Sequence, residues 1–239
     1  MIKKKVIFIA LAFLLSVNVF SQYDKNKISI SLGPSFSVGD FSSKNLFNTS
    51  AGDANTGINF YLYYCYNVTR NYSFGLKIFD NFNKYNTNAR INDLNYSTGN
   101  VWTTKSVYWS THGYLLGVAA HIPETKKFII DIRFFSGYLF LNLPEYSFTN
   151  SSISNTWFRF DKISSRAIGY NIGTGFSYYF IPHWDILFNV DYIGANFIFA
   201  DKITTYSTGS INHYRNSKQT FDIINATVGI GYNFSKIFH

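Results

Sequence analysis

The sequence is poor in charge and in cysteine, and each shortage excludes a class of protein. Only 14% of its 239 residues are charged, whereas 20% are aromatic. This balance is atypical of a soluble enzyme, because so many aromatic side chains need a dry environment, and it excludes intrinsic disorder. Cys65 is the single cysteine. It cannot form an internal disulfide and offers no cysteine metal cluster, so we interpret it as a buried structural thiol.

Long apolar runs are missing beyond the N-terminal segment, which excludes a bundle of membrane-spanning helices. Lys3, Lys4 and Lys5 precede the mostly apolar stretch Val6–Val19. This order predicts a signal peptide over residues 1–21, with an uncleaved anchor helix as the alternative, and leaves residues 22–239 as a single domain. Lysine and arginine outnumber aspartate and glutamate by 21 to 13. They are scattered and form no stripe, so we expect no nucleic-acid partner.

Apolar residues alternate with small or polar ones along most of the remaining chain. Between Ile224 and Phe234, large apolar side chains hold most even positions, and glycine, threonine and asparagine hold the odd ones. A period of two is typical of strands with two different faces. The apolar set falls on even numbers throughout, which predicts one continuous sheet with one apolar face. The eight segments are 28–38, 58–68, 72–78, 114–120, 130–134, 168–178, 184–192 and 224–234.

The connections between these segments alternate between short and long. Short turns are expected at 69–71, 123–127 and 181–183, and long loops rich in Asn, Ser, Thr and Tyr at 40–55, 85–106, 142–165 and 200–219. This alternation is typical of outer-membrane barrels, whose short turns face the periplasm. An even number of strands also places both termini in the periplasm.

The volume of the even-numbered face decides between a membrane barrel and a soluble barrel or sandwich. That face carries far more large apolar side chains than the roughly dozen that the interior of an eight-stranded barrel can hold. The odd-numbered face is rich in Gly, Ser, Asn and Ala, which suits a narrow lumen, whereas a sandwich would need charge on its outer face. We therefore predict an all-β fold, an eight-stranded antiparallel up-and-down transmembrane β-barrel.

The last strand carries a pattern that resembles the barrel-assembly signal of outer-membrane proteins. Thr227, Gly229, Tyr232 and Phe234 match its polar, glycine and two aromatic positions, although Ser235–His239 follow. The segment Gly33–Phe41 looks like the opening of uncharacterised outer-membrane β-barrel proteins, and the whole chain resembles the small OmpA/OmpX-like class. This resemblance implies insertion by the barrel-assembly machinery, a place in the cell outer membrane and contact with its lipids and lipopolysaccharide.

A few charged residues have the parity of the lumen face. An isolated charge in a narrow interior costs several kcal/mol, so we expect these residues to form an ion-pair network that plugs the barrel. A narrow, gated ion channel is the alternative. The residues are Lys77, Asp131, Arg133, Asp185 and Asp191.

Asp80, Ser110 and His112 have the parity of the lipid face, near the outer ends of neighbouring strands. A serine, a histidine and an acid in the outer leaflet would suit a lipid A deacylase, although the order Ser-x-His is the reverse of that family's motif. Polar residues are also natural where strands leave the membrane. We therefore predict no enzyme, no catalytic residue, no metal and no cofactor.

The leading hypothesis is a monomeric, structural or surface-binding outer-membrane protein that uses its four long loops, for example in adhesion. These loops are more aromatic than inert linkers, and the sheet is expected to continue beyond the membrane. A hairpin arm is expected at 156–163. The aromatic residues are Trp102, Trp109, Tyr146, Trp157, Phe158, Phe160, Tyr206 and Tyr214.

Overall fold

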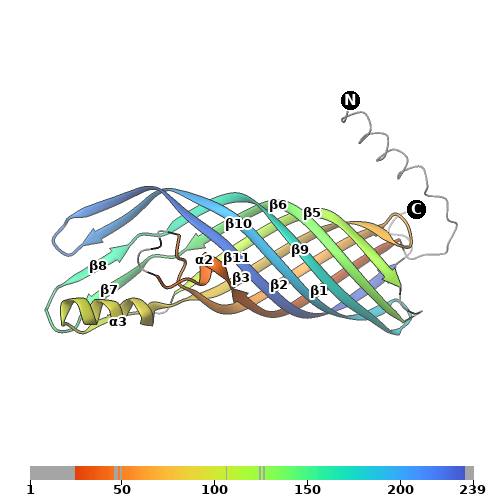
Figure 1. Ribbon diagram of the computed structural model, residues 1–239, viewed down its shortest axis with the longest axis horizontal. Coiled ribbons are helices and arrows are strands. Elements are labelled where there is room, and N and C mark those ends of the chain that lie inside the picture. Colours follow the sequence, from red (N-terminus) through yellow and green to blue (C-terminus); the bar gives the residue numbers. More distant parts are fainter. Residues whose placement is uncertain are drawn as a thin grey trace, which may run out of the picture.

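The computed structural model describes residues 25–45, 48, 50–105, 107–123, 125 and 127–234. Its strands form one tilted barrel with an extension at one end (Figure 1). The barrel strands are β1 (Asn26–Ser37), β2 (Ala54–Asn67), β3 (Tyr72–Tyr85), β5 (Tyr108–Pro123), β6 (Phe128–Leu143), β9 (Ile163–Ile181), β10 (Trp184–Tyr206) and β11 (Ile211–Phe234). The other elements are α2 (Gly39–Ser42), α3 (Thr87–Thr98), β4 (Trp102–Thr104), β7 (Tyr146–Asn150) and β8 (Trp157–Phe160).

The barrel closes because β11 pairs with both β10 and β1. The eight strands follow one another around the ring in chain order, and every neighbouring pair is antiparallel. Full closure leaves no sheet edge within the ring, which is a requirement for a sheet in lipid. The prediction of an eight-stranded antiparallel up-and-down barrel is confirmed.

The even-numbered face points outward, as its volume requires. Leu32, Leu116 and Ile168 expose 59%, 67% and 71% of their surface although they are large and apolar. Aromatic side chains gather at one border of this band, where Phe128 stacks on Tyr178 at 4.9 Å and Trp184 lies 4.9 Å from Tyr232. An outward apolar band with an aromatic border is the surface that a bilayer covers.

The two ends of the barrel differ. At one end, called here the turn end, β2 joins β3, β5 joins β6 and β9 joins β10 through short connections. At the other, the loop end, β10 pairs with β8, β8 with β7, and β7 with β4. These three short strands, α3 and the outer part of the β10–β11 hairpin form the extension (Figure 1).

The extension corrects three predictions. The expected loop at 85–106 contains α3 and β4, and the hairpin arm expected at 156–163 is instead formed by β7 and β8, which pair with each other. Residues 200–219 were expected to be a loop, but Asp201–Thr205 pair with Ile211–Arg215 as a continuation of β10 and β11. The side chains from Ile211 to Asn216 are all exposed, so no alternation of polarity marked the strand. The predicted signal peptide lies outside the described residues. Within the described ranges, neither helix has the length and apolar character needed to cross a membrane.

Candidate functional site

The charged residues expected in the lumen all lie on strands of the barrel with their side chains buried. Lys77 comes from β3, Asp131 and Arg133 from β6, and Asp185 and Asp191 from β10. Their odd numbers direct them inward, because side chains alternate between the two faces of a strand.

Four of these residues form an ionic layer across the lumen, defined here as Lys77, Asp131, Arg133 and Asp191. Lys77 Nζ lies 2.9 Å from Asp191 Oδ2, and the Arg133 guanidinium lies 3.4 Å from Asp191 Oδ1 and 3.2 Å from Asp131 Oδ1. Arg133 also donates a hydrogen bond of 2.7 Å to Asn189. Two cations therefore face two carboxylates, so the layer is neutral as a unit.

The ionic layer also depends on neutral neighbours. The Lys77 ammonium lies 4.1 Å from the centre of the Tyr61 ring, a cation–π contact. Asn171 donates to Asp191 at 3.3 Å and accepts from Lys77 at 3.3 Å. Gly173 is required beside them, because a Cβ at this position would overlap the carboxylate of Asp191. Small residues of the lumen face thus make room for the charged ones.

Asp185 does not join this layer. Its partner is Lys27 of β1, which forms an ion pair with it and also donates a 3.3 Å hydrogen bond to Ser177. Sequence reasoning missed Lys27, which lies one residue before the first alternating segment. Its odd number was the available signal, since it gives Lys27 the parity of the lumen face.

The lumen face becomes apolar immediately beyond the ionic layer. Phe79, Phe135 and Ile193 follow Lys77, Arg133 and Asp191 by two residues on the same strands, and each is at most 1% exposed. The expectation of a small or polar odd-numbered face therefore holds only in part toward the loop end, where Asn59, Asn81 and Thr111 are buried beside large apolar side chains. We call these side chains the apolar seal: Phe79, Leu115, Phe135, Leu139, Ile193, Phe197, Phe221 and Ile223.

On its loop-end side, the seal is covered by Phe41, the buried residue of α2. Its ring lies 4.9 Å from that of Phe221 and 5.8 Å from that of Trp109. Within the seal, Gly113 permits the Phe79 ring to lie against β5, because a Cβ there would overlap the ring. The loop-end half of the lumen is thus packed with these apolar side chains and with a buried polar cluster that includes Asn81 and Asn83. A packed interior of this kind has few voids larger than a water molecule.

We therefore expect the purified protein to show no stable conductance in planar bilayers. An ion would have to cross the apolar seal without its water, which costs many kcal/mol. Current recordings with the wild type and with Arg133→Ala provide the check. A stable conductance that changes with Arg133→Ala would contradict the plugged lumen.

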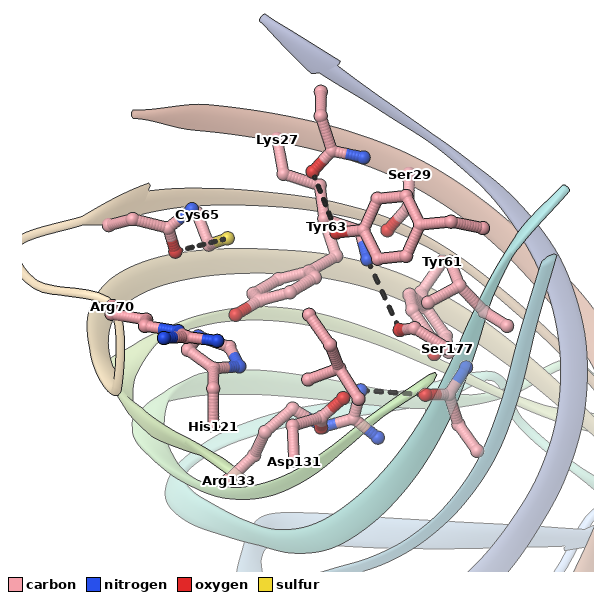
Figure 2. Close-up of a pocket in the computed structure, with 16 residues that line it drawn as sticks. Lys27, Ser29, Tyr61, Tyr63, Cys65, Arg70, His121, Asp131, Arg133 and Ser177 are labelled. Carbon is pink, nitrogen blue, oxygen red and sulfur yellow. Dashed lines mark hydrogen bonds and ion pairs between the residues drawn. The ribbon is translucent and has the colours of Figure 1, made fainter. Parts of the chain in front are cut away.

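A polar cavity occupies the lumen between the ionic layer and the turn end. It leaves only about 30 Å³ of room for solvent inside the barrel, and about 530 Å³ of space between atoms once its open mouth is counted. Figure 2 shows Lys27, Ser29 and Tyr63 on one side of it and His121, Asp131 and Arg133 on the other, with Arg70 extending from the β2–β3 turn. Cys65 lines the same cavity and is 1% exposed, so it is a buried thiol.

A further ionic contact, half-buried, fastens the extension to the loop end of the barrel. Arg90 of α3 donates a 2.8 Å hydrogen bond from Nε to Asp53 Oδ2, and Tyr85 donates to the same oxygen at 3.4 Å. Burial raises the pKa of the Asp53 carboxyl, although Arg90 favours its charged form. Burial also raises the pKa of Tyr146, which packs 5.2 Å from Tyr85. This contact positions α3 over the loop end, although removing the two charges from water carries a desolvation penalty.

Most of the loop aromatic residues pack against one another. Trp102, Trp109 and Tyr146 are buried, and Tyr146 stacks on Phe160 at 4.9 Å. Phe148, which sequence reasoning did not single out, stacks on Phe158 at 5.0 Å. Of the eight aromatic residues expected to mark a binding surface, seven are buried or half-buried, and Tyr214 is exposed. All of them except Trp109, which packs on Phe41 over the seal, and the exposed Tyr214 line the interior of the extension.

On the outer face, the register places Asp80 of β3 directly opposite His112 of β5. Asp80 Oδ1 and His112 Nδ1 are hydrogen-bonded, and both side chains are partly exposed. Ser110 lies two residues before His112 on the same face, opposite Phe82 and Asn142. The structure therefore brings the acid and the histidine together.

The residues of the assembly-like pattern lie at the end of β11. Thr227 is buried in the lumen, and Gly229 pairs with Ser31 of β1. Tyr232 and Phe234 stack on each other at 6.0 Å on the outer face. Among the described residues, no group of three or more His, Cys, Asp or Glu side chains is arranged to hold a metal ion.

No protein-family model and no curated protein sequence matches this chain. Solved structures do. Neisserial surface protein A is similar with a TM-score of 0.52 at 8% identity, over 88% of this chain and 97% of that one. A major outer membrane protein from Thermus thermophilus is similar with a TM-score of 0.51 at 13% identity, over 87% and 99%. At these identities the likeness concerns the fold, which is that of the small outer-membrane β-barrels.

Proposed function

We propose that this chain, which has the fold of the small outer-membrane β-barrels, is a non-enzymatic outer-membrane protein that binds a surface ligand through its extension. The observation that supports this is the contrast between the two parts of the molecule. The lumen is plugged by the ionic layer and the apolar seal, whereas the extension is a folded unit that carries exposed apolar side chains. These side chains are Tyr96 (94% exposed), Val101 (56%), Ile153 (48%), Ile211 (55%) and Tyr214 (49%).

The orientation follows from the same division. The short connections belong in the periplasm, together with the first residues of β1 and the last of β11, which pair with each other. The even-numbered face contacts outer-membrane lipids and lipopolysaccharide. Thr227, Gly229, Tyr232 and Phe234 serve the barrel-assembly machinery during insertion, and the mature protein is a monomer.

Replacing Tyr96, Ile153, Ile211 and Tyr214 together by serine tests the binding role. Retention of intact cells on polystyrene and on protein-coated glass under flow is expected to fall at least tenfold, because full burial of even one of the four side chains contributes about 1.5–3 kcal/mol. Asn92→Ser with Thr208→Ser is the matched control, since both residues are exposed on the extension.

Outer-membrane fractionation and heat-modifiable gel mobility must show that every variant forms the barrel in the membrane. Unchanged retention of the serine variant, with intact barrels, would refute the binding role. A wild-type protein found in the soluble periplasmic fraction, with no mobility shift, would refute the membrane assignment.

The bonded pair of Asp80 and His112 supports one alternative, a lipid A deacylase with Ser110 as nucleophile. Mass spectrometry of lipid A from cells with the wild type, with His112→Asn and with no protein distinguishes the two functions. The non-enzymatic proposal expects the same acyl pattern in all three samples. A shortened pattern that depends on His112 would establish the deacylase instead.

A further inference from the structure

We propose that the cavity at the turn end binds a small anionic group, a carboxylate or a phosphate. Nothing in the proposed surface role requires this cavity. It is closed toward the loop end by the ionic layer and the apolar seal, so a ligand would enter and leave through the turn end. Its narrow interior and open mouth admit at most one compact group and exclude a polymer.

The charges that line the cavity are mostly positive. Lys27, Arg70 and Arg133 contribute cationic groups, Asp131 contributes a carboxylate, and His121 contributes an imidazole. Lys27 and Arg133 are neutralised by the aspartates described above. Arg70 forms no ion pair within the described part of the chain. It is an exposed residue at the turn-end edge of the cavity, beside His121. An incoming anion therefore meets an unpaired positive charge first and a buried guanidinium below it (Figure 2).

The wall also contains buried groups that can donate hydrogen bonds and have no partner in the described structure. They are the Ser29 and Tyr63 hydroxyls and the Nδ2 amide of Asn189, in residues that are 3%, 6% and 3% exposed. A buried donor without a partner costs about 1–3 kcal/mol. These donors come from β1, β2 and β10, on different sides of one cavity. Hydrogen-bond donors that face the same cavity, together with the unpaired positive charge of Arg70, are suited to bind the oxygen atoms of an oxyanion.

Titrations of the purified protein, folded in zwitterionic micelles, with inorganic phosphate and with acetate provide the first test. Ionic strength is held constant with chloride. We expect saturable shifts of the backbone amide resonances of Ser29, Tyr63 and His121 with at least one of the two anions, and the two titrations tell phosphate from carboxylate. Arg70→Gln should weaken this binding at least several-fold, whereas Lys84→Gln, at the loop end of β3, should leave it unchanged.

The single cysteine gives an independent measurement. Cys65 lines the cavity, and a methanethiosulfonate reagent converts a thiolate into a mixed disulfide with release of a sulfinate. We expect the anionic sulfonatoethyl reagent to react about tenfold faster than the cationic trimethylammonium reagent, because the local potential concentrates anions. Arg70→Gln should remove most of this preference, and the bound anion should slow both reactions.

The proposal is overturned if neither anion gives saturable shifts, or if the shifts are equal in the Arg70→Gln variant. It is equally overturned if the cationic reagent reacts as fast as the anionic one. A Cys65 thiol that reacts with neither reagent would show a cavity closed to solutes, which also contradicts the proposal.

Discussion

Arg133→Met is expected to destabilise the folded barrel by about 3–5 kcal/mol, the cost of breaking a buried ion pair by removing one partner. Arg133 is 4% exposed and contacts both Asp131 and Asp191. Its removal leaves two buried carboxylates facing Lys77 alone. Urea unfolding in micelles, followed by tryptophan fluorescence and by loss of heat-modifiable mobility, measures the change.

The double variant Arg133→Met with Asp131→Asn separates charge balance from the loss of packing. It leaves Lys77 and Asp191, whose contact is 2.9 Å, as a neutral pair. We expect it to be clearly more stable than Arg133→Met alone. If the single variant unfolded at the same urea concentration as the wild type, the ionic layer would contribute nothing to stability, which would contradict this prediction.

Leu116→Arg is expected to cost about 2–4 kcal/mol and to reduce insertion into the membrane, because the guanidinium would lie in the middle of the outward apolar band. Leu116 is 67% exposed and pairs with Leu76 on one side and Ser136 on the other. In a soluble barrel the same substitution would add a harmless surface charge. The sign and size of this effect therefore test which face contacts lipid.

Tyr96→Arg is the matched control, because Tyr96 is 94% exposed on α3 of the extension. Reversible folding into vesicles, with the fraction folded measured on unheated gels, gives the free-energy difference. Equal folding of Leu116→Arg and Tyr96→Arg would contradict the membrane-facing assignment of the even-numbered residues.

Alternation of polarity was sufficient to predict the ring of the barrel. It succeeded because each barrel strand separates two different environments. Successive side chains point to opposite faces of the sheet, so apolar and polar residues alternate with a period of two. The same signal failed beyond the membrane. From Ile211 to Asn216 every side chain is exposed, and a strand whose two faces meet the same solvent has no alternation to read.

The lumen was only partly predictable. Odd parity identified Lys77, Asp131, Arg133, Asp185 and Asp191 as inward-facing residues, and the structure places all five in the lumen. Parity says nothing about depth along the barrel axis. Phe79 and Lys77 are both odd, yet one belongs to the apolar seal and the other to the ionic layer. The pairing of Asp185 with Lys27 also lay beyond sequence reasoning, because these residues are 158 positions apart.

The sequence by itself thus determined which way the barrel side chains point, because the direction of a side chain is a local property of an extended backbone. Only the tertiary structure decided which side chains meet. Closure of β11 onto β1 and the register of each pair set the height of every residue. They separate the cavity, the ionic layer and the apolar seal along one axis, and they gather short segments into an extension. These contacts join distant parts of the chain, so no local pattern could specify them.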